Sequence, residues 1–209
     1  GFDERLHWRC HFVQKLESEP AIEHHNFVRA LDGLREDSLN PDFLAAWCEG
    51  KTGYPMIDAC MRCLVETGWL NFRMRAMLAS FAAYQLWLHW KPTALFTARA
   101  WLDYEPGIHY SQFQMQSGTT GINTLRIYNP IKQSQDHDPD GVFLRRWIPE
   151  LAGVSSTWIH TPWLMPDELQ ASSGVRIGRD YPAPVVDHLA AVAEAKRRIA
   201  AHRASQPEY

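Results

Sequence analysis

Two carboxylates and a histidine lie close together in the middle of the chain, in the stretch LDYEPGIHYSQFQMQSGTTG at residues 102–121. Asp103 and Glu105 can pair with cationic side chains, or they can accept hydrogen bonds from the N–H groups of a bound heterocycle. Acid–base catalysis of the glycosidase type is a third interpretation. His109 follows, but a lone histidine is more often structural than catalytic. The neighbouring Tyr104 and Tyr110 do not single out a sugar site, so the pattern favours binding or ion pairing over hydrolysis.

Two arginines lie in the otherwise apolar segment 69–90. Trp69 and Arg73 are four residues apart and are predicted to share one helix face, whereas Arg75 is predicted on another. Buried charges are unfavourable unless they meet anions. An internal ion pair, with Asp103 or Glu105 as the partner, is the simpler interpretation. Contact with a phosphate or with an electron-rich ring is the alternative.

Other catalytic signatures are weak or absent from the sequence. Cys60 and Cys63 form a CxxC within a helical pattern and lack a second ligand pair, so they are predicted to be core cysteines. The ten histidines form no HExxH motif, and the sequence predicts no metal site. It also contains no GxGxxG, P-loop or GxSxG motif.

Composition narrows the class of protein further. The 209 residues suffice for a sizeable core, and the 9 tryptophans, 9 phenylalanines and 7 tyrosines suit a flat ligand. A net charge of −3 gives no overall attraction to nucleic acid, so any DNA contact requires a local basic patch. With no secretory signal and no long apolar run, the sequence predicts a cytoplasmic protein that does not enter a membrane.

The spacing of apolar residues predicts an all-α domain. Proline and glycine positions place the ends of several helices. Residues 102–121 are predicted to be irregular or to form short helical turns, residues 117–130 a loop, and residues 161–184 a segment that wraps the surface. Helices are predicted over residues 2–16, 41–48, 54–66, 69–90, 92–102 and 185–203, with a short one within 138–151.

Several motifs resemble those of the photolyase/cryptochrome flavoproteins. They are WCEGKTGYPMIDACMRCLVETGWLNFRMRAMLASF, RIYNPIKQSQDHDPDGVFLRRWIPEL, LHWRCHF and IHTPW, which together cover about residues 2–166. The resemblance implies the helical FAD-binding domain of that family with its N-terminal part missing. Residues 1–166 are then the FAD-binding-type domain, and 167–209 supply a surface-wrapping segment and the last helix of the same domain.

The resemblance also implies roles for individual residues. Asp103 is expected to pair with Arg75, Glu105 to face the polar edge of the flavin, and His109 to face its N5 atom. Trp90 is expected to carry electrons toward the flavin, although as a tryptophan it also fits a plain core position. The implied cofactor contacts are Arg9, Trp69, Arg75, Asp103, Glu105 and His109, the catalytic residues Trp90 and His109, and the DNA contacts Trp8 and Arg73.

Departures from the family pattern leave the activity open. His109 replaces a residue that is usually asparagine in repair enzymes, Phe72 replaces a lesion-contacting asparagine, and Phe113 replaces the flavin-proximal tryptophan. The expected function is light-driven electron transfer from reduced flavin to damaged DNA, of the deoxyribodipyrimidine photo-lyase type. The alternatives are a cryptochrome-like light-sensing or redox flavoprotein without dimer repair, and a helical interaction domain that no longer binds flavin.

The chain begins with Gly1 rather than methionine. By comparison with the family, the N-terminal α/β antenna domain and the phosphate-binding segment precede this point. We therefore expect weak or no FAD retention, no activity of this piece alone, and self-association through the uncovered face as a homodimer.

Overall fold

The computed structural model describes residues 1–121 and 125–205. These residues are helical and contain no strand, only one isolated bridge between Ile177 and Tyr181. Short 3₁₀ turns connect several of the helices. The α-helices are α1 Phe2–Ser18, α2 Pro41–Cys48, α3 Pro55–Thr67, α4 Phe72–Ser80, α5 Trp90–Ala98, α6 Pro106–Ser117, α7 Pro130–His137, α8 Val142–Trp147, α9 Asp167–Ser172 and α10 His188–Ala204. The prediction of an all-α domain is confirmed.

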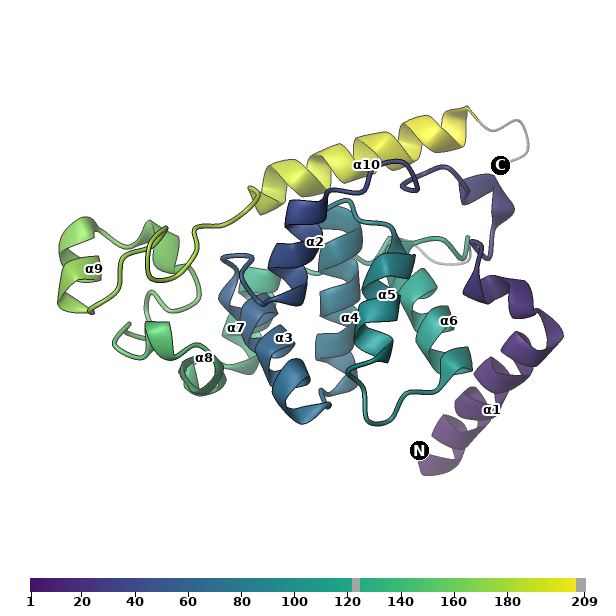
Figure 1. Ribbon diagram of the computed structural model, residues 1–209, viewed down its shortest axis with the longest axis horizontal. Helices are drawn as coiled ribbons and strands as arrows, with labels where there is room; N and C mark the ends of the chain where they lie inside the picture. Colours follow the sequence, from purple (N-terminus) through teal and green to yellow (C-terminus); the bar gives the residue numbers. More distant parts are fainter. Residues whose placement is uncertain (122–124, 206–209) are drawn as a thin grey trace.

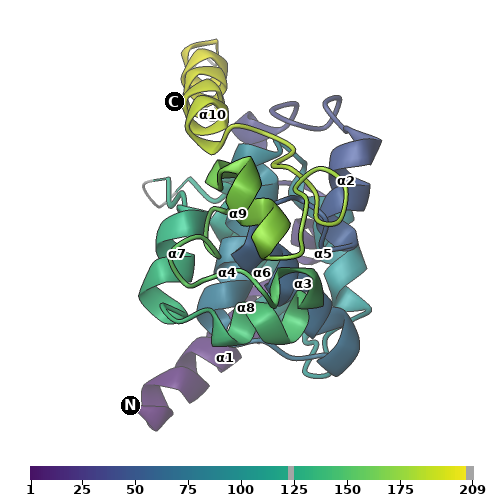
Figure 2. The same cartoon turned by 90° about the vertical axis from the view of Figure 1, so that its left-hand side faces the viewer.

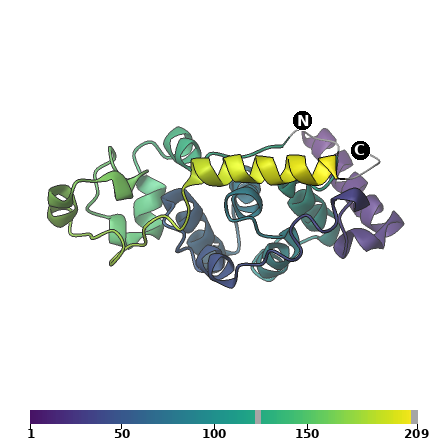
Figure 3. The ribbon, with the colours of Figure 1, turned by 90° about the horizontal axis from the view of Figure 1, so that it is seen from above.

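The helices α3 and α4 form the centre of the molecule (Figure 1). α4 packs against α3 and α6, and α5 packs against α6 and α2. α7 and α8 cover the other side of α3 (Figure 2). α10 lies lengthwise across the bundle, and α1 projects from one end (Figure 3). The main core is therefore built around α3 and α4, where residues such as Ile57, Met61 and Met77 are fully buried.

The segment 69–90 is not one helix, and this prediction is wrong. Asn71 caps α4 by accepting a hydrogen bond from the N–H of Met74, so the helix begins after Trp69. α4 continues into a π-turn at Phe81–Gln85, and the chain then bends at Trp87, whose φ of 53° is left-handed. Residues 76–86 are all buried, so apolar periodicity could not show where the helix ends.

The helix predicted over 92–102 begins earlier and ends earlier, at Trp90 and Ala98. Pro92 lies in its first turn, where a proline is tolerated because the N–H it lacks would have no helical partner. The hydrogen bonds of His89, whose side chain accepts from the Lys91 N–H, mark the true start. The sequence signal therefore placed the helix correctly but shifted its bounds.

Two further helices were missed, and both begin with a side-chain cap followed by proline. Glu105 accepts hydrogen bonds from Gly107 and Ile108 at the start of α6, which ends at Gly118 with φ 74°. α6 is one continuous helix over most of the stretch 102–121, which was predicted to be irregular or to form only short helical turns. Asn129 caps α7 in the same way, where the sequence indicated a turn. Residues 122–124 of the predicted loop lie outside the described residues.

The segment 161–184 does more than wrap the surface. It contains the short helix α9 and places Val175 and Tyr181 in the main core, each 1% exposed. The hydroxyl of Tyr181 reaches the buried carboxylate of Asp58 in α3. Residues 167–205 are therefore anchored to the central helices by buried side chains.

Candidate functional site

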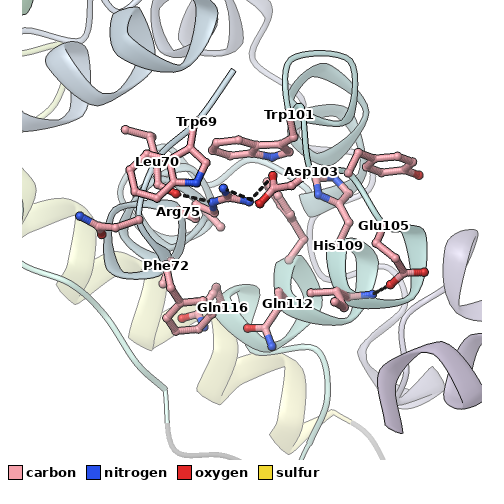
Figure 4. A pocket seen from close by; sticks show the side chains of 16 residues that line it. Trp69, Leu70, Phe72, Arg75, Trp101, Asp103, Glu105, His109, Gln112 and Gln116 are labelled. Carbon is pink, nitrogen blue, oxygen red and sulfur yellow. Dashed lines mark hydrogen bonds and ion pairs between the residues drawn. The ribbon is translucent and has the colours of Figure 1, made fainter. Parts of the chain in front are cut away.

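A cavity of about 410 Å³ opens between α4, α6 and the connection from α5 to α6 (Figure 4). Most of its wall is aromatic or aliphatic, and a few polar groups converge on it, as is typical of sites for flat organic ligands. Its lining residues are Trp69, Leu70, Asn71, Phe72, Arg75, Ala76, Ala79, Trp101, Asp103, Tyr104, Glu105, Ile108, His109, Gln112, Phe113 and Gln116.

The pair of Arg75 and Asp103 joins the two walls of the cavity. Arg75 donates two parallel hydrogen bonds to the Asp103 carboxylate, Nη1 to Oδ1 at 2.9 Å and Nη2 to Oδ2 at 3.0 Å. Its Nε donates to the carbonyl of Leu70 at 2.7 Å, and its guanidinium lies 4.1 Å from the ring centroid of Trp101. The expected pairing is present, and it holds the α5–α6 connection against α4 (Figure 4).

Glu105 does not form the ion pair with an arginine that the sequence allowed; it caps α6 instead. Its two carboxylate oxygens accept the N–H groups of Gly107 at 3.2 Å and Ile108 at 2.8 Å. A carboxylate at this end of a helix also meets the positive end of the helix dipole. Glu105 therefore fixes the start of α6, and with it the wall of the cavity.

His109 presents a defined tautomer to the cavity. Its Nε2 lies 2.8 Å from the carbonyl oxygen of Ala94, which can only accept, so Nε2 carries the proton and Nδ1 carries a lone pair. Burial lowers the pKa of His109 to about 4, although the hydrogen bond to Ala94 acts in the opposite direction. At neutral pH His109 is therefore an uncharged hydrogen-bond acceptor.

Two glutamines of α6 were not foreseen from the sequence. Gln112 and Gln116 line the cavity, and within the described part of the chain the buried Oε1 atom of each has no hydrogen-bond partner. With Ile108 they follow a spacing of four residues along one face of α6. That spacing was the available signal, but its meaning was not apparent because residues 102–121 were not expected to form one continuous helix.

The other predicted site residues do not all meet at this cavity. Trp69 lines it, but it precedes α4 and so does not share a helix face with Arg73, contrary to the prediction. Arg73 lines a neighbouring cavity of about 630 Å³ beside His137. Trp8 and Arg9 lie on α1 and are not among the described residues that line either cavity. Their roles stay predictions.

Trp90 lies behind the wall rather than in it. It is 1% exposed, its Nε1 donates to Oδ1 of Asn26 at 2.7 Å, and it packs with Phe113, which does line the cavity. Cys60 and Cys63 are buried, and burial raises the pKa of both thiols, in agreement with core positions.

The described residues show neither a metal-binding cluster nor a membrane-spanning helix. Among residues 1–121 and 125–205, no group of three or more His, Cys, Asp or Glu side chains is arranged to hold a metal ion. Over the same residues, no helix has both the length and the apolar character needed to cross a bilayer.

Comparison with known proteins decides the family. Residues 2–201 match the family described as the FAD binding domain of DNA photolyase. The chain belongs to the photolyase/cryptochrome family. The fold is therefore the helical FAD-binding domain of that family, and FAD is the cofactor of the domain.

Individual members of the photolyase/cryptochrome family agree in sequence and structure. The deoxyribodipyrimidine photo-lyase of Vibrio cholerae is 41% identical over 186 residues, which are 88% of this chain and 38% of that protein. A class III photolyase from Agrobacterium tumefaciens superposes with a TM-score of 0.89 at 31% identity, over 98% of this chain and 42% of the other. A Synechocystis cryptochrome superposes with a TM-score of 0.87 at 29% identity, over 94% of this chain and 41% of the other. The chain thus spans about two fifths of the length of these relatives.

The cavity has the chemistry that a flavin ring requires. Trp69, Trp101 and Ile108 offer apolar and aromatic surface, while the Arg75–Asp103 pair supplies both donors and acceptors at one edge. The buried Oε1 atoms of Gln112 and Gln116 can accept hydrogen bonds from N–H groups of a heterocycle. In their types and placement, these residues fit the isoalloxazine part of FAD.

Proposed function

We propose that the cavity between α4 and α6 holds the isoalloxazine ring of FAD, and that the domain serves light-driven electron transfer to damaged DNA. The observation that carries this proposal is the Arg75–Asp103 pair at one edge of an otherwise mainly apolar cavity. Bound flavin supplies one-electron chemistry after it absorbs light. The protein residues bind and orient the ring and keep water from its faces.

Each polar residue of the site then has a proposed task. Arg75 and Asp103 orient the polar edge of the ring, and Glu105 keeps α6 in place beneath it. His109 offers the lone pair of Nδ1 to an N–H group of the ring, in line with its expected place near N5. Trp69, which is 57% exposed, covers the ring from the mouth of the cavity.

Damaged DNA is the proposed macromolecular partner. Arg73 lies at the exposed start of α4, next to the aromatic rim formed by Trp69 and Phe72. Arginine can bind a backbone phosphate while an aromatic ring stacks on a base. Trp8 and Arg9 of α1 add a second exposed aromatic and cationic pair. We place the protein in the cytoplasm, with residues 1–166 and 167–209 forming one domain that can self-associate.

A cryptochrome-like role without repair is the second candidate, and Phe72 favours it. This side chain lines the cavity and is 58% exposed, but it has no group that can hydrogen-bond to a base. A pocket that recognises a damaged base through hydrogen bonds would lose that contact here. Light-driven flavin reduction, by contrast, needs no polar group at this position.

Loading with FAD tests the proposed function. The chain is incubated with FAD and desalted, and the visible absorption of oxidised flavin is recorded. Ala76→Phe fills part of the cavity and should prevent retention, whereas Ala200→Phe, on the exposed face of α10, should retain FAD as the wild type does. Circular dichroism checks that both variants are folded. If the wild-type chain retains FAD and Ala76→Phe retains it equally, the ring lies elsewhere.

A longer chain that carries the upstream segment separates ring binding from phosphate binding. If only the longer chain retains FAD, the ring site is correct and the phosphates need residues that precede it. If neither chain retains FAD, the proposed function is wrong. DNA contact is then tested by the salt dependence of binding to an irradiated duplex, with Arg73→Ala expected to reduce the slope.

A further inference from the structure

A buried arginine outside the cavity joins the two helices that form its walls. Arg35 lies in the segment before α2 and is 1% exposed. Its Nε donates to the carbonyl of Ala83 at 3.0 Å, and its Nη1 donates to the carbonyl of Ser117 at 3.1 Å. Ala83 lies in the π-turn that continues α4, and Ser117 is the last residue of α6. One guanidinium therefore connects the end of α4 to the end of α6.

Two arginines thus connect the same pair of helices, one at each end. Arg75 lies in the first turn of α4 and pairs with Asp103, just before α6 begins. Arg35 connects the same helices where both end. Because the two starts are joined and the two ends are joined, α4 and α6 run in the same direction, with the cavity between them.

The carbonyls that Arg35 binds lie close to residues of the cavity wall. Ala79 is one helical turn before Ala83, and Gln116 directly precedes Ser117. Both Ala79 and Gln116 line the cavity. The guanidinium is planar and rigid, so its two N–H groups fix the separation of the carbonyls that accept them. Arg35 therefore sets the distance between the cavity walls at the glutamine end.

Two helix ends take the place of a counter-ion for this buried cation. Carbonyls in the last turn of a helix lack helical partners and carry the negative end of the helix dipole. The carboxylate of Glu36 accepts the backbone N–H of Arg35 at 2.9 Å, and within the described residues Nη2 has no hydrogen-bond partner. Burial lowers the pKa of Arg35 to about 10, while Tyr84 and Glu36 raise it, so the side chain is charged at neutral pH.

Aromatic rings hold the guanidinium in place. Its Cζ lies 4.5 Å from the ring centroid of Trp87 and 5.4 Å from that of Tyr84. Trp87 has the left-handed φ of 53°, which persists only where the surrounding structure stabilises it. Arg198 of α10 lies 5.2 Å from the same indole. The attraction between these cations and the ring offsets the strained backbone and restricts the movement of Arg35.

We propose that Arg35 is a positioning residue for the cofactor: it fixes the separation of α4 and α6 at the glutamine end of the cavity and so keeps the isoalloxazine ring in one orientation. This inference rests on the proposed function. Arg35 acts through the wall residues Ala79 and Gln116 and does not line the cavity itself, within the part of the chain that the structure describes.

Arg35→Met tests this role in whichever chain retains FAD. The affinity should fall by about tenfold in a fluorescence titration, because the walls no longer keep their separation. The visible circular dichroism of bound flavin, measured at saturating FAD, should also weaken, because it depends on a fixed orientation of the ring. At saturation this signal per bound flavin does not depend on how stable the chain is.

Arg62→Met is the matched control. The Nε of Arg62 likewise donates to a backbone carbonyl, that of Gly50 at 3.1 Å, and Arg62 pairs with Glu150. It lies in α3 and is not among the described residues that line the cavity. This variant should lose stability, yet its flavin circular dichroism at saturation should equal that of the wild type.

Hydrogen exchange of the empty chain supplies a readout that needs no flavin. In Arg35→Met, amides in the last turn of α6 should exchange at least about tenfold faster relative to those of α3 in the same molecule. Arg62→Met should not show this local change. Arg35→Lys is a second variant in case Arg35→Met does not fold. It keeps a cation at the helix ends but lacks the planar fork, so its flavin circular dichroism should also weaken.

The outcomes separate this inference from the proposed function. If no chain of either length retains FAD, the proposed function and the role of Arg35 toward the cofactor are both overturned. If FAD is retained, and both Arg35 variants show the affinity and circular dichroism of the wild type, the role of Arg35 alone is overturned. An equal weakening of the flavin signal in Arg62→Met would overturn it too, since general destabilisation would then explain the effect.

Discussion

The hydroxyl of Tyr181 donates a hydrogen bond of 2.5 Å to the Asp58 carboxylate, across 123 positions of sequence. The same carboxylate accepts the N–H groups of Thr52 at 2.7 Å and Gly53 at 3.0 Å. Burial raises the pKa of Asp58 to about 6, although these hydrogen bonds lower it. A single buried carboxylate thus connects α3, the turn before it and the segment 161–184.

Replacing Asp58 by asparagine should change how stability depends on pH. Folding raises the pKa of this carboxyl from 3.8 to about 6, so the folded protein binds more protons than the unfolded chain between these values. The wild type therefore loses free energy of unfolding as pH rises through this range. Asp58→Asn lacks this loss and should gain stability relative to the wild type as pH rises. Urea unfolding at several pH values measures this difference in unfolding free energy between the variant and the wild type. Asp140→Asn, which is exposed, is the control, and a pH-independent difference in Asp58→Asn would contradict the prediction.

His109 should act in the opposite direction over an overlapping range. Folding lowers its pKa from 6.5 to about 4, so the unfolded chain binds more protons between these values and stability falls as pH falls. His109→Gln can still donate to the Ala94 carbonyl but does not titrate, so it should lose less stability than the wild type on acidification. Urea unfolding at the same pH values measures this loss of stability, and His137→Gln, at an exposed position, is the control. If the unfolding free energies of His109→Gln and the wild type fall equally on acidification, the imidazole of His109 is not buried in its neutral form.

Asp103→Ala should separate stability from cofactor binding. The Asp103 side chain is 53% exposed, so loss of its pair with Arg75 should lower the free energy of unfolding by about 1 kcal/mol or less. The affinity for FAD should fall by about tenfold or more, because Arg75 is no longer held at the edge of the ring. Asp180→Ala breaks a similarly exposed pair with Arg179 and should leave FAD affinity unchanged. Urea unfolding and a fluorescence titration with FAD measure the two effects. Equal FAD affinities in both variants would refute the edge contact.

The helix caps Glu105 and Asn129 form a matched pair for mutation. Each side chain accepts two backbone N–H groups at the start of a helix, Glu105 in α6 and Asn129 in α7. Alanine at either position should cost about 1 kcal/mol in unfolding free energy. FAD retention should fall in Glu105→Ala alone, because α6 forms a wall of the cavity and α7 does not. A similar loss of FAD in Asn129→Ala would mean that general destabilisation, rather than the position of α6, explains the effect.

The helical class could be predicted from the spacing of apolar residues. The Arg75–Asp103 pair could be predicted from the resemblance of the motifs. Helix bounds were harder where capping side chains, rather than apolar periodicity, set them. Asn71, Glu105 and Asn129 each start a helix by a local hydrogen bond, and two of these are followed by proline, a signal that also marks turns. The break at Trp87 has no sequence signal, since only tertiary packing stabilises a left-handed tryptophan.

Charged residues of the site, such as Arg75 and Asp103, could be named from the sequence. Residues that line the cavity because they share one face of a helix could not. Gln112 and Gln116 line the cavity because both lie on one face of α6, an arrangement that exists only once the helix has formed. The position of Trp90 behind the wall, and that of Tyr110 between Trp90 and His109, likewise depend on how α5 packs against α6.

If FAD binds in the cavity as proposed, the two buried glutamine oxygens on α6 connect the stability of the folded chain to its cofactor. A buried carbonyl oxygen without a partner raises the energy of the helix that carries it, and a ligand that binds only the folded form lowers that energy again. Empty molecules will therefore open α6 more often than loaded ones and expose its backbone to proteases. The supply of FAD would then affect how long the folded chain survives proteolysis.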